Sequence, residues 1–103
     1  MSENKLILLS RAGCCLCEGL EDRLRNLELD QLTPPLKLSI RDIDGADVQN
    51  WERELYSLQV PVLLLVLERP LRQLELPRVS PRISEEVLFN WLQTKICEKL
   101  KNI

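Results

Sequence analysis

The sequence contains no histidine, and this absence excludes several kinds of active site. A Cys–His nucleophile pair, a Ser–His triad and an imidazole ligand for zinc all require an imidazole side chain. Any activation of a thiol must therefore come from backbone dipoles or from arginine and lysine side chains.

Long apolar runs and a strong net charge are missing as well. No apolar stretch approaches the about 18 residues that a membrane-spanning helix needs. The run that follows Lys5 has only four apolar residues, too few for the core of a signal peptide. A net charge of −2 gives no electrostatic reason to bind nucleic acid or an anionic membrane. We therefore expect a cytoplasmic protein that binds neither nucleic acid nor membranes.

The chain is long enough for one domain with its own core. Its 103 residues are 45% hydrophobic and 29% charged, an ordinary globular composition. A chain of this length can fold without a stabilising metal ion or disulfide. No repeat, low-complexity tract or linker interrupts it, so we expect a single domain over residues 1–103 and a monomer.

Three of the four cysteines, Cys14, Cys15 and Cys17, lie close together directly after the apolar run 5–9. In a reducing compartment, clustered cysteines are more often catalytic or metal-binding than structural. Cys14 and Cys17 are three positions apart at the start of a predicted helix, so they share one face and can form a small disulfide ring. The unpaired N–H groups and the positive dipole of a helix start favour a thiolate there.

Apolar runs and leucine stripes alternate along the chain and predict the order β-α-β-α-β-β-α. Strands are expected at 5–9, 36–42, 62–67 and 71–76, and helices from the cysteine pair to Leu29, around Val48, Trp51 and Leu55, and from Ser84 to Leu100. The first and third strands lack polar alternation, so both should be buried on two faces. The sequence therefore predicts an α/β fold, a small mixed sheet with helices on both faces.

For four further side chains the sequence predicts a place in the fold. Trp51 and Trp91 lie on apolar helical stripes and are expected in the core. Cys97, on the last helix, is expected to be a small buried hydrophobic side chain or to have no role. Cys15 is expected to be a small side chain in a turn, with a third redox-active or metal-coordinating thiol as the alternative.

The segment 9–17, with Cys-x-x-Cys opening the first helix, and Val60-Pro61-Val62 before the third strand resemble the thioredoxin-fold superfamily. The likeness is greatest to the short glutaredoxin-like proteins of bacteria and their relatives, and it implies a thioredoxin-like fold. It further implies that Cys14 attacks, that Cys17 resolves, and that Pro61 follows a cis peptide bond beside the disulfide. By the same resemblance, the backbone of Val60 pairs with that of a bound peptide or glutathione.

Arg11 stands three residues before Cys14, where a basic residue lies in the glutaredoxin-like proteins. We expect its guanidinium to stabilise a thiolate on Cys14 or to meet a substrate carboxylate. Other glutaredoxin features are replaced. Cys15-Leu16 stands between the two cysteines instead of Pro-Tyr or Pro-Phe, and the segment 76–81 has no Gly-Gly pair. A glutathione clamp is therefore not evident, although glutathione is a candidate reductant or co-substrate. We expect no bound cofactor and no metal.

The leading functional hypothesis is a thiol–disulfide oxidoreductase that acts on a protein or small-molecule disulfide. Cys14 would form a mixed disulfide with the substrate and Cys17 would displace the product. One alternative is a metal or iron–sulfur binding protein using the three clustered thiols, with a fourth ligand from Cys97, glutathione or a second chain. Another alternative is a non-catalytic interaction module with the same fold.

Overall fold

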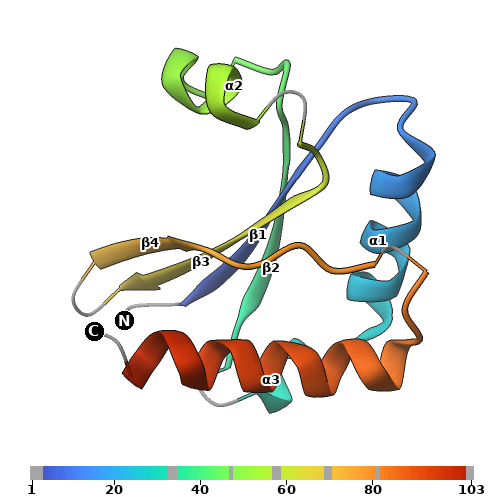
Figure 1. Ribbon diagram of the computed structural model, residues 1–103, viewed down its shortest axis with the longest axis vertical. Coiled ribbons are helices and arrows are strands. Elements are labelled where there is room, and N and C mark those ends of the chain that lie inside the picture. Colours follow the sequence, from blue (N-terminus) through green and yellow to red (C-terminus); the bar gives the residue numbers. More distant parts are fainter. Residues whose placement is uncertain are drawn as a thin grey trace.

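The computed structural model describes residues 4–32, 35–46, 48–56, 59–68, 71–80 and 82–101. Its elements are β1 (Lys5–Ser10), α1 (Cys15–Asn26), the 3-10 helix η1 (Leu29–Gln31), β2 (Lys37–Asp42), α2 (Asn50–Tyr56), β3 (Val62–Glu68), β4 (Leu71–Glu75) and α3 (Glu85–Lys101). Figure 1 shows their arrangement. The predicted order of strands and helices is confirmed. The first helix ends at Asn26 rather than at Leu29, because Leu27 takes an extended conformation.

The four strands form one mixed sheet in the order β2-β1-β3-β4. β1 runs parallel to β2 and antiparallel to β3, and β3 runs antiparallel to β4. The interior position of β1 explains its uniformly apolar sequence, because all four residues from Leu6 to Leu9 are buried. The edge strand β2 alternates polar and apolar residues, and none of its side chains is fully buried.

Successive residues of β1 point to opposite faces of the sheet and enter two separate cores. Leu6 and Leu8 pack in the larger core with buried side chains of α1 and α3. Ile7 and Leu9 pack in a smaller core with Ile43, Val48 and Tyr56. Figure 1 accordingly shows α2 on the other side of the strands from α1 and α3. Helices therefore cover both faces, as expected of the thioredoxin-like α/β fold.

The expectation that Trp51 lies in the core is wrong. Its side chain is 53% exposed, and its indole Nε1 donates a hydrogen bond of 2.7 Å to Oε1 of Gln49. The seven-residue helix α2 buries Glu52 and Tyr56, which share one face because they are four positions apart. Trp51 and Leu55 precede them by one position each, so both side chains point to solvent.

Two predictions at the last helix have different outcomes. Trp91 is partly buried and packs against the larger core, in keeping with its predicted place. Cys97 is exposed, so the expectation of a buried hydrophobic side chain is wrong. Across the ranges that the structure describes, no helix is long and apolar enough to cross a membrane.

Candidate active site at the start of the first helix

The chain turns sharply between β1 and α1 and places Cys14 at the N-cap of the helix. The Cys14 N–H donates to the carbonyl oxygen of Arg11 at 3.1 Å, which closes the turn. Gly13 has a φ of +80°, a left-handed conformation that strongly favours glycine. Cys14 itself is extended, and its Sγ accepts a hydrogen bond from the backbone N–H of Cys17 at 3.3 Å. A thiol thus occupies the place of a normal capping oxygen.

The surroundings of Cys14 favour its thiolate. The pKa of Cys14 is lowered, chiefly because the Cys17 thiol donates a hydrogen bond to it, and then because the N–H groups of Cys17 and Leu16 point toward its sulfur. Partial burial and the nearby charge of Glu18 act in the opposite direction. Cys14 is half-buried, so reagents can reach its sulfur. The helix start therefore favours a thiolate at Cys14 without any histidine.

Cys17 has the opposite character. Its side chain is 1% exposed, and burial raises its pKa to about 11, with the hydrogen bond to Cys14 adding to the rise. The backbone and the charge of Arg11 partly oppose the rise. Both thiols are free. The structure thus brings the predicted pair together and separates its members into an accessible, acidic thiol and a buried, weakly acidic one.

The third clustered thiol does not join this pair. Cys15 is exposed, whereas Cys17 is buried. Across the described residues, no three or more cysteine and carboxylate side chains converge in a way that could hold a metal ion. A thiolate metal site is therefore not preformed by the clustered cysteines of one chain.

Arg11 is bound to Asp44, a partner that the sequence analysis missed. Its Nε donates to Oδ2 of Asp44 at 2.8 Å and its Nη2 to Oδ1 at 3.2 Å. The pairing raises the pKa of Arg11 and lowers that of Asp44. Asp44 lies in the turn after β2, where its N–H donates to the side chain of Asp42. The Asp-Gly turn was visible in the sequence, but nothing local marked its aspartate as the partner of Arg11.

An open cavity of about 340 Å³ lies between α1 and β2. Arg11 and Cys17 both line it, together with Glu18, Glu21 and Asp42. The charge of Arg11 lowers the pKa of Cys17 across this space. The charge of Arg11 thus favours the thiolate of the buried Cys17. That Arg11 stabilises a thiolate on Cys14 or meets a substrate carboxylate stays a prediction.

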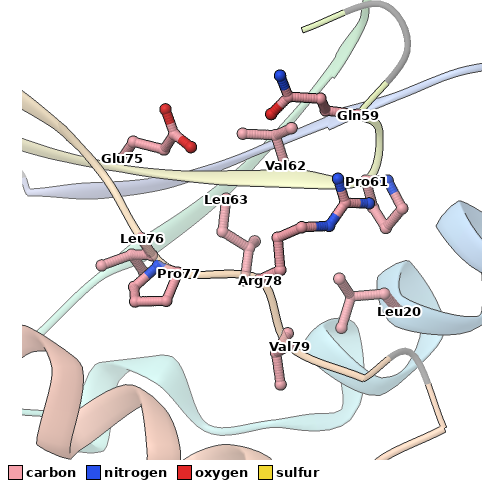
Figure 2. Close-up of a pocket in the computed structure, with 10 residues that line it drawn as sticks. All are labelled: Leu20, Gln59, Pro61, Val62, Leu63, Glu75, Leu76, Pro77, Arg78 and Val79. Atoms are coloured by element: carbon pink, nitrogen blue, oxygen red, sulfur yellow. The ribbon is translucent and has the colours of Figure 1, made fainter.

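Val60 and Pro61 lie on the other side of β1. The peptide bond between them is cis, as the resemblance implied. The antiparallel register ends with Leu9 opposite Val62, so the two residues lie beside the turn that leads from β1 to the cysteines. Val60 packs partly buried against the smaller core. Pro61 is buried and lines a narrow groove with Leu20 of α1 (Figure 2).

Arg78 is a second residue that the sequence analysis did not single out. It lies between β4 and α3, in the glycine-free segment that stands where glutaredoxins have their Gly-Gly pair. Figure 2 shows its side chain extending across the groove toward Pro61. The signal in the sequence was a glycine-free segment with a large cation, where the resemblance implies a Gly-Gly pair.

A family comparison agrees with this geometry. A model of the family described as "Glutaredoxin-like domain (DUF836)" matches residues 5–93. The chain belongs to this glutaredoxin-like family. The match confirms the predicted resemblance, and the strand order of the sheet agrees with its thioredoxin-like fold. No curated protein and no solved structure shows a significant match to the chain.

Proposed function

We propose that this glutaredoxin-like protein is a thiol–disulfide oxidoreductase in which Cys14 attacks and Cys17 resolves. The observation that carries the proposal is the N-cap position of Cys14, whose sulfur accepts a hydrogen bond from the N–H of Cys17 at 3.3 Å. This contact stabilises a thiolate and holds the second thiol next to it. Both conditions are needed for a two-step exchange.

The reaction begins when the Cys14 thiolate attacks one sulfur of a substrate disulfide. The substrate S–S bond breaks, one substrate thiolate leaves and takes a proton from water, and a mixed disulfide remains on Cys14. Cys17 then gives its proton to water and attacks Sγ of Cys14, which releases the second substrate thiolate. The net result is two substrate thiols and a Cys14–Cys17 disulfide, which an external thiol reductant such as glutathione would reduce again.

The two flanks of the helix start have separate roles in this proposal. Arg11 places a positive charge near Cys17 and so lowers the free-energy cost of forming its thiolate in the second step. Val60, before the cis Pro61, offers its backbone to the substrate chain next to the reacting disulfide. Substrates are disulfides of proteins or small molecules, and the protein acts as a monomeric single domain in the cytoplasm, where thiols are kept reduced.

Cysteine variants test the roles of the two thiols. Cys15→Ser, Cys97→Ser is a suitable background because both side chains are exposed and could react with reagents. In that background Cys14→Ser should abolish reduction of a peptide disulfide. Cys17→Ser should instead accumulate the mixed disulfide, detected by intact mass. Equal reduction rates with and without Cys14 would contradict the proposal and favour a non-catalytic module.

The pH dependence of thiol alkylation tests the activation of Cys14. Its pKa is lowered, so the pH at which its alkylation rate reaches half of the maximum should lie below that of free cysteine measured under the same conditions. The Cys17 side chain is the main cause, so Cys17→Ala should move the midpoint upward. Cys17→Ser is the matched control, because its hydroxyl can still donate a hydrogen bond to the thiolate. Identical midpoints in both variants, equal to that of free cysteine, would refute this mechanism of activation.

A further inference from the structure

The groove beside Pro61 has a fixed wall on the side of the last helix. In the segment between β4 and α3, Leu76 N–H donates to the carbonyl oxygen of Leu63 at 2.9 Å. Leu76 is buried, and Val79 packs partly buried against the larger core. These contacts hold the backbone on both sides of Arg78, whereas the Arg78 side chain itself is exposed.

The guanidinium of Arg78 has no protein partner in the part of the chain that the structure describes. This distinguishes it from Arg11, which is bound to Asp44, and from Arg25, which is bound to Glu21. One acidic residue, Glu75, also lines the groove, but its carboxylate accepts the hydroxyl hydrogen of Tyr56 at 3.0 Å. The guanidinium that extends toward Pro61 therefore makes no ion pair with the described groups of its own groove, in which Glu75 is the one acidic residue.

The size of the groove limits what can bind there. Its free volume is about 10 Å³, room for roughly one water molecule. A substrate side chain therefore does not enter it, and a bound chain must lie across its mouth. A chain that pairs with the backbone of Val60 would pass the guanidinium of Arg78, which Figure 2 shows beside Pro61.

We propose that Arg78 is a specificity-determining residue that binds a carboxylate adjacent to the disulfide of the substrate. The proposal rests on the oxidoreductase function, because it concerns the substrate of that same site. A guanidinium presents a planar fork of N–H donors that matches a carboxylate, which can accept two hydrogen bonds from it. The carboxylate can belong to an acidic residue of a protein or to a small carboxylate-bearing disulfide, and the test separates these two sources.

The test compares three synthetic peptide disulfides that differ only in the residue next to cysteine: aspartate, asparagine or lysine. The wild-type protein should reduce the aspartate peptide with a kcat/KM about fivefold above that of the lysine peptide, the size of an exposed ion pair near 1 kcal/mol. Arg78→Gln should remove this preference and Arg78→Glu should invert it. Arg82→Gln is the matched control, because Arg82 is an exposed arginine outside the groove. Raised salt should weaken the preference in the wild type.

Glutathione disulfide serves as the small-molecule arm of the same experiment. A loss in Arg78→Gln confined to the aspartate peptide supports the proposal and identifies a protein segment as the source of the carboxylate. A loss of activity in Arg78→Gln that is confined to glutathione disulfide also supports the proposal, and it identifies a small disulfide as the source of the carboxylate. If the wild type reduces all three peptides equally and Arg78→Gln reduces glutathione disulfide normally, the proposal is overturned while the oxidoreductase function stands. If the reduction of every substrate is independent of Cys14, the oxidoreductase function itself is refuted.

Discussion

Arg11, in the turn before α1, and Arg78, in the segment between β4 and α3, differ in what they contact. On the β2 side, Arg11 makes two hydrogen bonds to Asp44 and lines a cavity with the buried Cys17. On the β3 side, Arg78 extends toward the cis Pro61 and has no ion pair among the residues that the structure describes.

This difference indicates separate uses of the same side chain. A guanidinium that already binds a carboxylate must break that pair before it can hold a ligand, so Arg11 is suited to a fixed electrostatic effect on a nearby thiol. An unpaired guanidinium loses only water when a ligand binds, so Arg78 is suited to recognition. From the sequence both roles were expected of Arg11; we propose instead that Arg11 acts on the thiol and that Arg78 binds the substrate.

The difference between the paired Arg11 and the unpaired Arg78 can be removed by giving Arg78 a carboxylate partner within the protein. Ser80 is exposed and two positions away, and its hydroxyl accepts the N–H of Arg82, a role that an aspartate can keep. Ser80→Asp should reduce the preference for the aspartate peptide from about fivefold to about twofold or less, because the new carboxylate competes for the guanidinium. The measurement is kcat/KM for the aspartate and lysine peptides, with Ser80→Asn as the uncharged control. An unchanged preference in Ser80→Asp would show that Arg78 is not the selective group.

The assignment of Arg11 to the second step can be sharpened by removing its charge. Arg11 lowers the pKa of Cys17, so in Arg11→Gln that pKa should rise further above its value of about 11. At neutral pH the Cys17 thiolate fraction then falls, and closure of the mixed disulfide should slow about two- to threefold, a modest effect because Arg11 is exposed to solvent.

Single-turnover kinetics can follow the two steps separately. The first attack by Cys14 should keep its rate in Arg11→Gln, since the charge of Arg11 acts on the other thiol. Arg25→Gln is a suitable control, because it removes a paired arginine of α1 that does not line the cavity beside Cys17. A slower first step with an unchanged second step would show that Arg11 stabilises the Cys14 thiolate, as predicted from the sequence.

The smallest expected effect concerns stability. The Arg11–Asp44 pair is exposed, and exposed ion pairs stabilise a fold little. Asp44→Asn should therefore leave the urea midpoint of unfolding unchanged within error. Leu24→Ala should instead lower the free energy of unfolding by about 2–5 kcal/mol, because it removes a buried side chain of the larger core. A large loss of stability in Asp44→Asn would show that the pair has a structural role as well.

Much of the fold was predictable because its signals are local. Uniformly apolar runs marked β1 and β3 as interior strands, and the leucine spacing marked α1 as a helix with one buried face. The short helix α2 was harder. Over seven residues, a helical pattern is compatible with more than one buried face, and the predicted face with Trp51 was one position away from the observed face with Glu52 and Tyr56.

The sequence by itself determined the order of the elements and the spacing that puts Cys14 and Cys17 on one helical turn, since both depend on residues close together in the chain. Only the tertiary structure decided which thiol is buried and which arginine is paired. Arg11 and Asp44 are 33 positions apart, and Arg78 reaches Pro61 from a separate segment. Packing of the sheet and helices brings such distant residues together, and no local pattern records their contacts.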